Sequence, residues 1–95
     1  MVIATCIVEL DLPGVRSLKE KRSIIRPIVK RLPRQFNVAI AEVGHQNRWG
    51  STVLGIVTVG NDAGYLHGLL EKSVAWIERE RPDAPLLEYS IEISR

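Results

Sequence analysis

Two alternating sets of residues make up the first part of the chain, from Val2 to Leu12. One set is entirely apolar and the other mixes apolar, hydroxyl and acidic side chains, which is the period of a pleated strand. The segment Pro13–Gly14 ends this strand. Ser17 and Glu20 have the spacing of a capping box, in which each side chain accepts a hydrogen bond from a free backbone N–H. The sequence therefore predicts a strand followed by a helix that begins at Leu18.

The first helix is predicted from apolar positions that recur every three or four residues. These positions form a core face and are Leu18, Ile25, Ile28, Val29 and Leu32. Pro27 lies inside this pattern, and an interior proline removes one hydrogen bond and crowds the carbonyl of Ser23. We therefore expect a kink near Ser23 or a break there, and we expect Pro33 to end the helix.

Two further apolar segments, Phe36–Val43 and Thr52–Val59, flank the polar stretch from Gly44 to Ser51. Their β-branched residues and the glycines between them predict two strands joined as a hairpin. Asn61–Asp62 is typical of a helix N-cap, so a second helix is predicted from there to about Arg81. Its apolar stripe consists of Leu66, Leu69, Leu70, Val74 and Ile77.

The end of the chain completes the pattern. Pro82 and Pro85 end the second helix, and alternating residues from Leu87 to Ile93 predict a last strand with one solvent-facing side. The order β-α-β-β-α-β, with short links, predicts an α+β protein of the ferredoxin-like type. In that fold both helices cover one face of a four-stranded antiparallel sheet, and the first and third strands are central. With 95 residues the chain forms a single domain over 1–95.

The sheet face opposite the helices, here called the open face, is predicted to be apolar. We expect it to carry Ile3, Thr5, Ile7 or their alternates, together with Leu54, Ile56 and Thr58. Monomers seldom leave a large apolar patch in water, so a homodimer that packs through this face is expected. The face lacks the stacked aromatic residues with which RNA-recognition motifs bind bases.

Several segments in order resemble the YlxP-like family of small bacterial proteins. They are Leu12–Gly14, Arg16–Arg22, Phe36–Val38, Ala41–Val43, His45–Gln46 with Trp49, and Gly60–Asp62. The run Arg-Ser-Leu-Lys-Glu-Lys-Arg is the most distinctive of them. The resemblance covers nearly the whole chain and implies a ferredoxin-like domain whose biochemical role is not established. Genes of the family often lie near those of translation and ribosome-maturation factors, which implies a connection to RNA or the ribosome.

Charge is strongly segregated along the chain. The stretch from Arg16 to Arg34 holds eight basic side chains and one acidic side chain, whereas the rest holds five basic and ten acidic ones. Five of the basic residues recur every three or four positions and share one flank of the first helix. These five are called the basic ridge and are Lys19, Arg22, Arg26, Lys30 and Arg34. Such a ridge attracts phosphates by releasing condensed counterions, so it is a candidate site for RNA. The alternatives are a solvated helix face and contact with an acidic partner protein.

The hairpin loop, residues Gly44 to Gly50, is a second candidate element. Arg48 and Trp49 are candidate RNA-binding residues because arginine and tryptophan are common anchors at interfaces and tryptophan stacks on bases. Alternatively, Trp49 packs at the end of the core or at a dimer seam. His45 with Glu42 makes a poor metal site, so structural hydrogen bonds of His45 and no metal are expected.

No catalytic constellation is evident, and we expect neither an enzyme nor a cofactor. Cys6 is the one cysteine and lies within an apolar run, so it is expected to be a small buried hydrophobic residue. No glycine-rich phosphate fingerprint is present. A small-ligand sensor that binds at a dimer seam is a third alternative. Without a leader segment or a membrane span, the chain is expected to be cytoplasmic.

Overall fold

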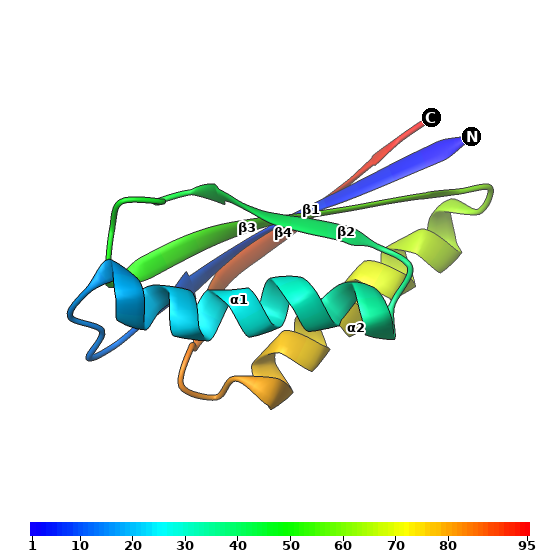
Figure 1. The fold of residues 1–95 in the computed structure, drawn as a ribbon. Coiled ribbons are helices and arrows are strands. Elements are labelled where there is room, and N and C mark those ends of the chain that lie inside the picture. Colours follow the sequence, from blue (N-terminus) through cyan, green and yellow to red (C-terminus); the bar gives the residue numbers. More distant parts are fainter.

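The computed structural model describes all 95 residues as a sheet covered on one face by two helices (Figure 1). The elements are β1 (Val2–Asp11), α1 (Leu18–Gln35), β2 (Ala39–Gly44), β3 (Ser51–Gly60), α2 (Ala63–Glu80) and β4 (Leu86–Ser94). The strands lie in the order β2-β3-β1-β4 and every neighbouring pair is antiparallel. The predicted ferredoxin-like topology, with β1 and β3 in the centre, is therefore confirmed.

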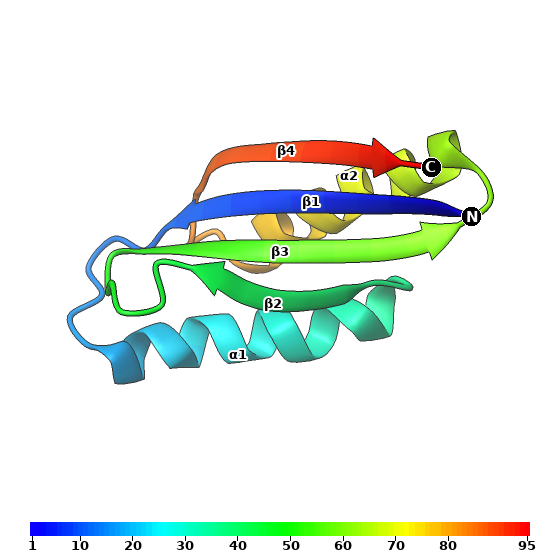
Figure 2. The same ribbon diagram turned by 90° about the horizontal axis from the view of Figure 1, so that it is seen from above.

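The core lies between the sheet and the helices. Alternate residues of β1, among them Cys6 and Val8, are fully buried against the helical layer. Ile28 of α1 and Leu70 of α2 are buried from the other side. Seen from above the open face, α1 runs alongside the outer edge of β2, whereas α2 lies beneath the other side of the sheet (Figure 2). One flank of α1 is therefore left free at the margin of the molecule.

The start of α1 follows from the predicted cap. The Ser17 hydroxyl accepts a hydrogen bond from the Glu20 backbone N–H at 3.1 Å. The Glu20 carboxylate in turn accepts one from the backbone N–H of Arg16 at 3.0 Å, one residue before the expected partner. Both bonds satisfy N–H groups at the helix end, where no carbonyl of the helix can reach them. This fixes the point from which the basic ridge begins.

The expected effects of the two prolines are wrong in part. The helix is unbroken at Ser23 and runs past Pro33 to Gln35. Each proline removes only one N–H donor, and its fixed φ is compatible with a helix. Ser23 is exposed, so its carbonyl can bond to water, while Ile25 and Ile28 on either side of Pro27 are held in the core. Packing therefore outweighs the lost hydrogen bonds.

The largest boundary difference is at the start of β2. The strand begins at Ala39 and not at Phe36, because Phe36 closes α1 by donating its backbone N–H to the carbonyl of Leu32 at 3.0 Å. The Asn37 carbonyl then accepts a hydrogen bond from the Thr58 hydroxyl at 2.8 Å. The cap of α2 is confirmed, because the Asp62 carboxylate accepts hydrogen bonds from two N–H groups of its first turn. Apart from the end of α1, the other boundaries lie within one residue of those predicted.

The predicted composition of the open face is wrong for β3. Cys6 lies opposite Ile56 in the sheet, and Ile7 lies opposite Gly55. Because residues that face each other across a ladder share one side of the sheet, Ile56 lies on the buried side together with Leu54 and Thr58. The open face instead carries Val53, Gly55, Val57 and Val59 of β3 beside Ile3, Thr5 and Ile7 of β1.

Candidate functional site

The basic ridge forms one exposed band along α1. All five of its side chains are exposed, and none makes an ion pair. A helix advances about 100° per residue, so spacings of three and four keep the five residues on one flank. The helix itself lies at the margin of the molecule, alongside β2 (Figure 2).

On the side of α1 that contacts α2, the one basic side chain, Arg31, is neutralised by an ion pair. The Arg31 guanidinium makes an ion pair with the Glu80 carboxylate of α2 at 2.7 Å. The same guanidinium lies 5.3 Å from the centre of the Trp76 ring, within the range of a cation–π contact. Arg31 therefore belongs to the packing between the helices, and the unpaired positive charge of α1 is confined to the ridge.

Lys21 lies at the base of the ridge, where its side chain is almost completely buried. Its ammonium group donates hydrogen bonds to the carbonyls of His45 at 2.5 Å and Arg48 at 2.7 Å. It also makes an ion pair with the Glu42 carboxylate at 2.8 Å. Lys21 has a relative exposure of 2%, and these two carbonyls and one carboxylate compensate its buried charge. The hairpin loop is thereby fastened to α1.

The rest of the loop is held by side chains at its two ends. Glu42 accepts a further hydrogen bond from the Thr52 hydroxyl at 2.5 Å, so its carboxylate is an internal partner and not a solvated edge group. His45 has a φ of 58°, and its ring nitrogens lie 2.9 Å from the Ser51 hydroxyl and 3.2 Å from the Arg48 guanidinium. The expected structural hydrogen bonds of His45 are confirmed.

A groove separates α1 from the hairpin loop. Its volume is about 330 Å³, and it is lined by Leu18, Lys21, Arg22, Ile25 and Arg26 of α1, Glu42 of β2, and Gln46 and Asn47 of the loop. Two members of the basic ridge therefore face the loop across this groove. Of the predicted loop residues, Arg48 and Trp49 are exposed but do not line it. The sequence did not single out Gln46, Asn47 or the buried Lys21.

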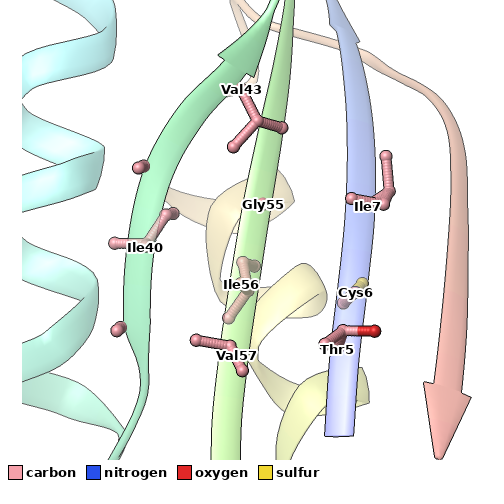
Figure 3. Close-up of a pocket in the computed structure, with 10 residues that line it drawn as sticks. Thr5, Cys6, Ile7, Ile40, Val43, Gly55, Ile56 and Val57 are labelled. Atoms are coloured by element: carbon pink, nitrogen blue, oxygen red, sulfur yellow. The ribbon is translucent and has the colours of Figure 1, made fainter.

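The open face has an apolar hollow of about 310 Å³ over β1, β2 and β3 (Figure 3). Gly55 lies at its centre, and a Cβ placed there would meet a methyl carbon of Val43 at 3.0 Å. Ile7, Val43 and Val57 are 38–51% exposed around it. On the same face β4 contributes two carboxylates, here called the acidic margin, which are Glu88 and Glu92.

The chemistry of Cys6 is that of a buried thiol. Burial, with a smaller contribution from the negative charge of Glu71, raises the pKa of the Cys6 thiol from 9.0 to about 11. The thiol is therefore protonated near neutral pH, and a protonated thiol is a poor nucleophile. No three His, Cys, Asp or Glu side chains gather into a cluster that could hold a metal ion. Neither helix combines the length and hydrophobicity needed to cross a membrane.

Residues 3–91 match the model of a family described as "Protein of unknown function (DUF503)". A curated relative is the "Uncharacterized protein YlxP" of Bacillus subtilis (strain 168), which is 37% identical over 62 residues. That match covers 65% of this chain and 67% of the relative. Both findings confirm the resemblance seen in the sequence.

Two solved structures show the same fold at low sequence identity. A de novo designed protein with a ferredoxin fold is 12% identical, with a TM-score of 0.56 over 100% of this chain and 86% of the design. A variant of SnoaB, a cofactor-independent oxygenase from Streptomyces nogalater, is 12% identical, with a TM-score of 0.51 over 98% of this chain and 91% of that chain. At such identities the likeness concerns the fold alone.

Proposed function

The chain belongs to the DUF503 family of proteins of unknown function, and we propose that it is a non-catalytic protein that binds RNA through the basic ridge. The observation that supports this proposal is the set of five exposed cationic side chains on one flank of α1, none of which has a carboxylate partner. Because no ion pair has to be broken, each of these side chains is free to contact a phosphate.

The energetic basis of such binding is the release of counterions from the nucleic acid. Phosphate contacts position a protein on nucleic acid without reading its sequence. The cations that are already paired, such as Arg31 with Glu80 and Arg81 with Asp83, would have to give up a partner first. The ridge is therefore the part of the surface best suited to a polyanion.

The hairpin loop favours RNA among the polyanions. Trp49 is 51% exposed on this loop, and Arg48 is exposed beside it. An exposed indole provides a surface on which an unstacked base can lie, as is common in the recognition of single-stranded RNA segments. The resemblance to the YlxP-like family also favours RNA, and in particular ribosomal RNA, because genes of that family often lie near those of translation and ribosome-maturation factors.

A salt titration tests the proposal. Engagement of about four phosphates gives a slope of about −3 to −4 in a plot of log affinity against log salt concentration. We expect this slope for a fluorescently labelled structured RNA between about 50 and 200 mM salt, measured by fluorescence anisotropy. Absence of binding at low salt, or an affinity that does not change with salt, would contradict the proposal.

We also propose that the open face pairs with a second copy of the chain. The hollow over Gly55 is apolar, and the charged side chains of this face lie outside it, Glu88 and Glu92 on β4 and Glu9 and Asp11 at the end of β1. Two copies can therefore meet over the hollow without burying an ionised group, while these four carboxylates stay at the rim. Such a self-complementary contact is typical of two-fold homodimers.

Replacing Val57 by glutamate tests the dimer. Val57→Glu places a charge in the middle of the proposed contact, and it is expected to weaken association about 100-fold or more because an unpaired buried carboxylate costs several kcal/mol. Sedimentation velocity at micromolar concentration should show a dimer for the natural chain and a monomer for the variant. Tyr65→Glu, at an exposed position on α2, should stay dimeric. A natural chain that is monomeric at high micromolar concentration would exclude the dimer.

A further inference from the structure

The groove between α1 and the hairpin loop has two chemically different walls. The α1 wall presents the guanidinium groups of Arg22 and Arg26, neither of which makes an ion pair. The loop wall presents the side-chain amides of Gln46 and Asn47, which are exposed and form no hydrogen bond within the chain. A ligand in this groove would thus meet cations on one side and neutral hydrogen-bonding groups on the other.

We propose that this groove holds one unpaired nucleotide of the bound RNA. Its phosphate lies against Arg22 and Arg26, and the edge of its base faces Gln46 and Asn47. The inference rests on the proposed RNA-binding function and adds to it a defined site and the single-stranded character of the ligand.

The charge of the groove suits a phosphodiester. Glu42 also lines the groove, but its carboxylate is paired with the Lys21 ammonium at 2.8 Å and accepts a hydrogen bond from Thr52. These two paired charges cancel, so the two arginines determine the net positive charge of the site. Guanidinium groups bind phosphate oxygens through paired parallel hydrogen bonds, which makes arginine well suited to this contact.

The other surfaces of the groove suit a nucleoside. A primary amide carries both a donor and an acceptor, and can pair with the donors and acceptors on the edge of a base. Leu18 and Ile25 add an apolar surface between the two walls, against which a ribose or a base face can pack. A nucleotide combines the matching groups in one molecule, namely an anionic phosphate, a base edge with donors and acceptors, and an apolar base face or ribose.

The size of the groove favours an unpaired nucleotide over a duplex. Its volume of about 330 Å³ is bounded by α1 and the loop, and is that of a small-molecule pocket and not of a helix-binding cleft. In a duplex the pairing edges of the bases are occupied, and the deep major groove of an RNA helix excludes side chains. An unstacked base has a free edge that the loop amides can reach.

Lys21 makes the groove a preformed site. Its two hydrogen bonds to the carbonyls of His45 and Arg48 fix the loop backbone on either side of Gln46 and Asn47. A loop that is already fastened loses little conformational freedom when a ligand binds, which favours affinity. Lys21 is therefore a positioning residue for the site, and its ammonium group is not available to the ligand.

The test compares two RNA probes and one double variant. The probes are a labelled single-stranded RNA of about ten nucleotides, within the range of common single-strand sites, and the same strand annealed to its complement. Gln46→Ala with Asn47→Ala removes the amides and leaves every charge in place. We expect affinity for the single strand to fall about tenfold, as for the loss of one or two hydrogen bonds, and duplex affinity and the salt slope to stay unchanged.

The matched control is Gln35→Ala with Asn61→Ala, which removes two exposed amides far from the groove and should change neither affinity. If the loop variant binds the single strand as tightly as the natural chain does, the groove does not hold a base, although the ridge still binds RNA. If both probes lose affinity equally, the amides do not select unpaired RNA. If the natural chain binds neither probe, the proposed function itself fails.

Discussion

Replacing Lys21 by methionine is expected to lower the free energy of unfolding by about 3–4 kcal/mol, among the largest effects of any single substitution in this chain. The methylene chain is kept, so the change removes the charge and little volume. Glu42 loses its partner at 2.8 Å, and the carbonyls of His45 and Arg48 lose their charged donor. Because Glu42 is 22% exposed and reaches some water, the lower part of the range for a broken buried ion pair applies.

The measurement is urea unfolding followed by circular dichroism. Lys19→Met is the control, because it removes the same type of side chain from an exposed site on the same helix and should change stability by about 0.5 kcal/mol or less. In the Lys21 variant, core amides in the centre of β1 exchange through global unfolding and should therefore exchange faster in proportion to the lost stability, and exchange in the hairpin loop should also be faster. Equal stability of the two variants would show that Lys21 does not hold the loop.

Reversing the charge of Arg22 and Arg26 together is expected to weaken RNA binding about 100-fold at low salt. Each arginine lies on the basic ridge and also lines the groove, so both proposed contacts are lost at once. A hydrogen bond to a charged group contributes about 1.5–3 kcal/mol, and the lower end of this range for two exposed contacts, about 3 kcal/mol, corresponds to a loss of slightly more than 100-fold. The slope of log affinity against log salt should also become less steep by about two.

The control for this variant changes the net charge by the same amount elsewhere. Lys72→Glu with Arg79→Glu alters two exposed basic residues of α2 that also make no ion pair. If binding depends on the ridge, this control should keep most of its affinity and a steep salt slope. If both double variants bind equally poorly, only the total charge matters and the ridge is not a site. Fluorescence anisotropy with one RNA at several salt concentrations distinguishes these results.

The fold could be predicted from the sequence because its signals agree with one another. The cap at Ser17 and the cap at Asp62 mark both helices, and the alternation in β1 identifies its buried side. For β3, the predicted assignment of residues to the buried side and the open face was wrong. Val53, Leu54, Ile56 and Val57 are all apolar, so the pattern does not show which face is buried, and only the register against β1 decides it.

The prolines show the limit of local rules. Pro27 carries a real cost in a helix interior, but the helix continues because its neighbours Ile25 and Ile28 are buried against the sheet. The free energy of that packing comes from residues far away in the sequence, which local propensity does not include.

The candidate site could be predicted only in part from the sequence. The spacing of the ridge predicted its common flank, and the structure adds that the flank is exposed and unpaired. Lys21 was counted among the cations of this stretch, although a signal for its burial exists. It lies three residues after Leu18 and four before Ile25, and therefore on the core stripe. Its partner Glu42 lies on another element, so the ion pair itself required the three-dimensional structure.

The position of α1 along β2 and of the acidic margin along β4 places opposite charges at opposite sides of the sheet (Figure 2). The molecule therefore has an electric dipole that lies across its strands. In the field of a polyanion this dipole experiences a torque, which turns α1 forward before the two molecules touch. A larger share of collisions is then productive, so association is fast in dilute electrolyte and slows as mobile ions screen the field.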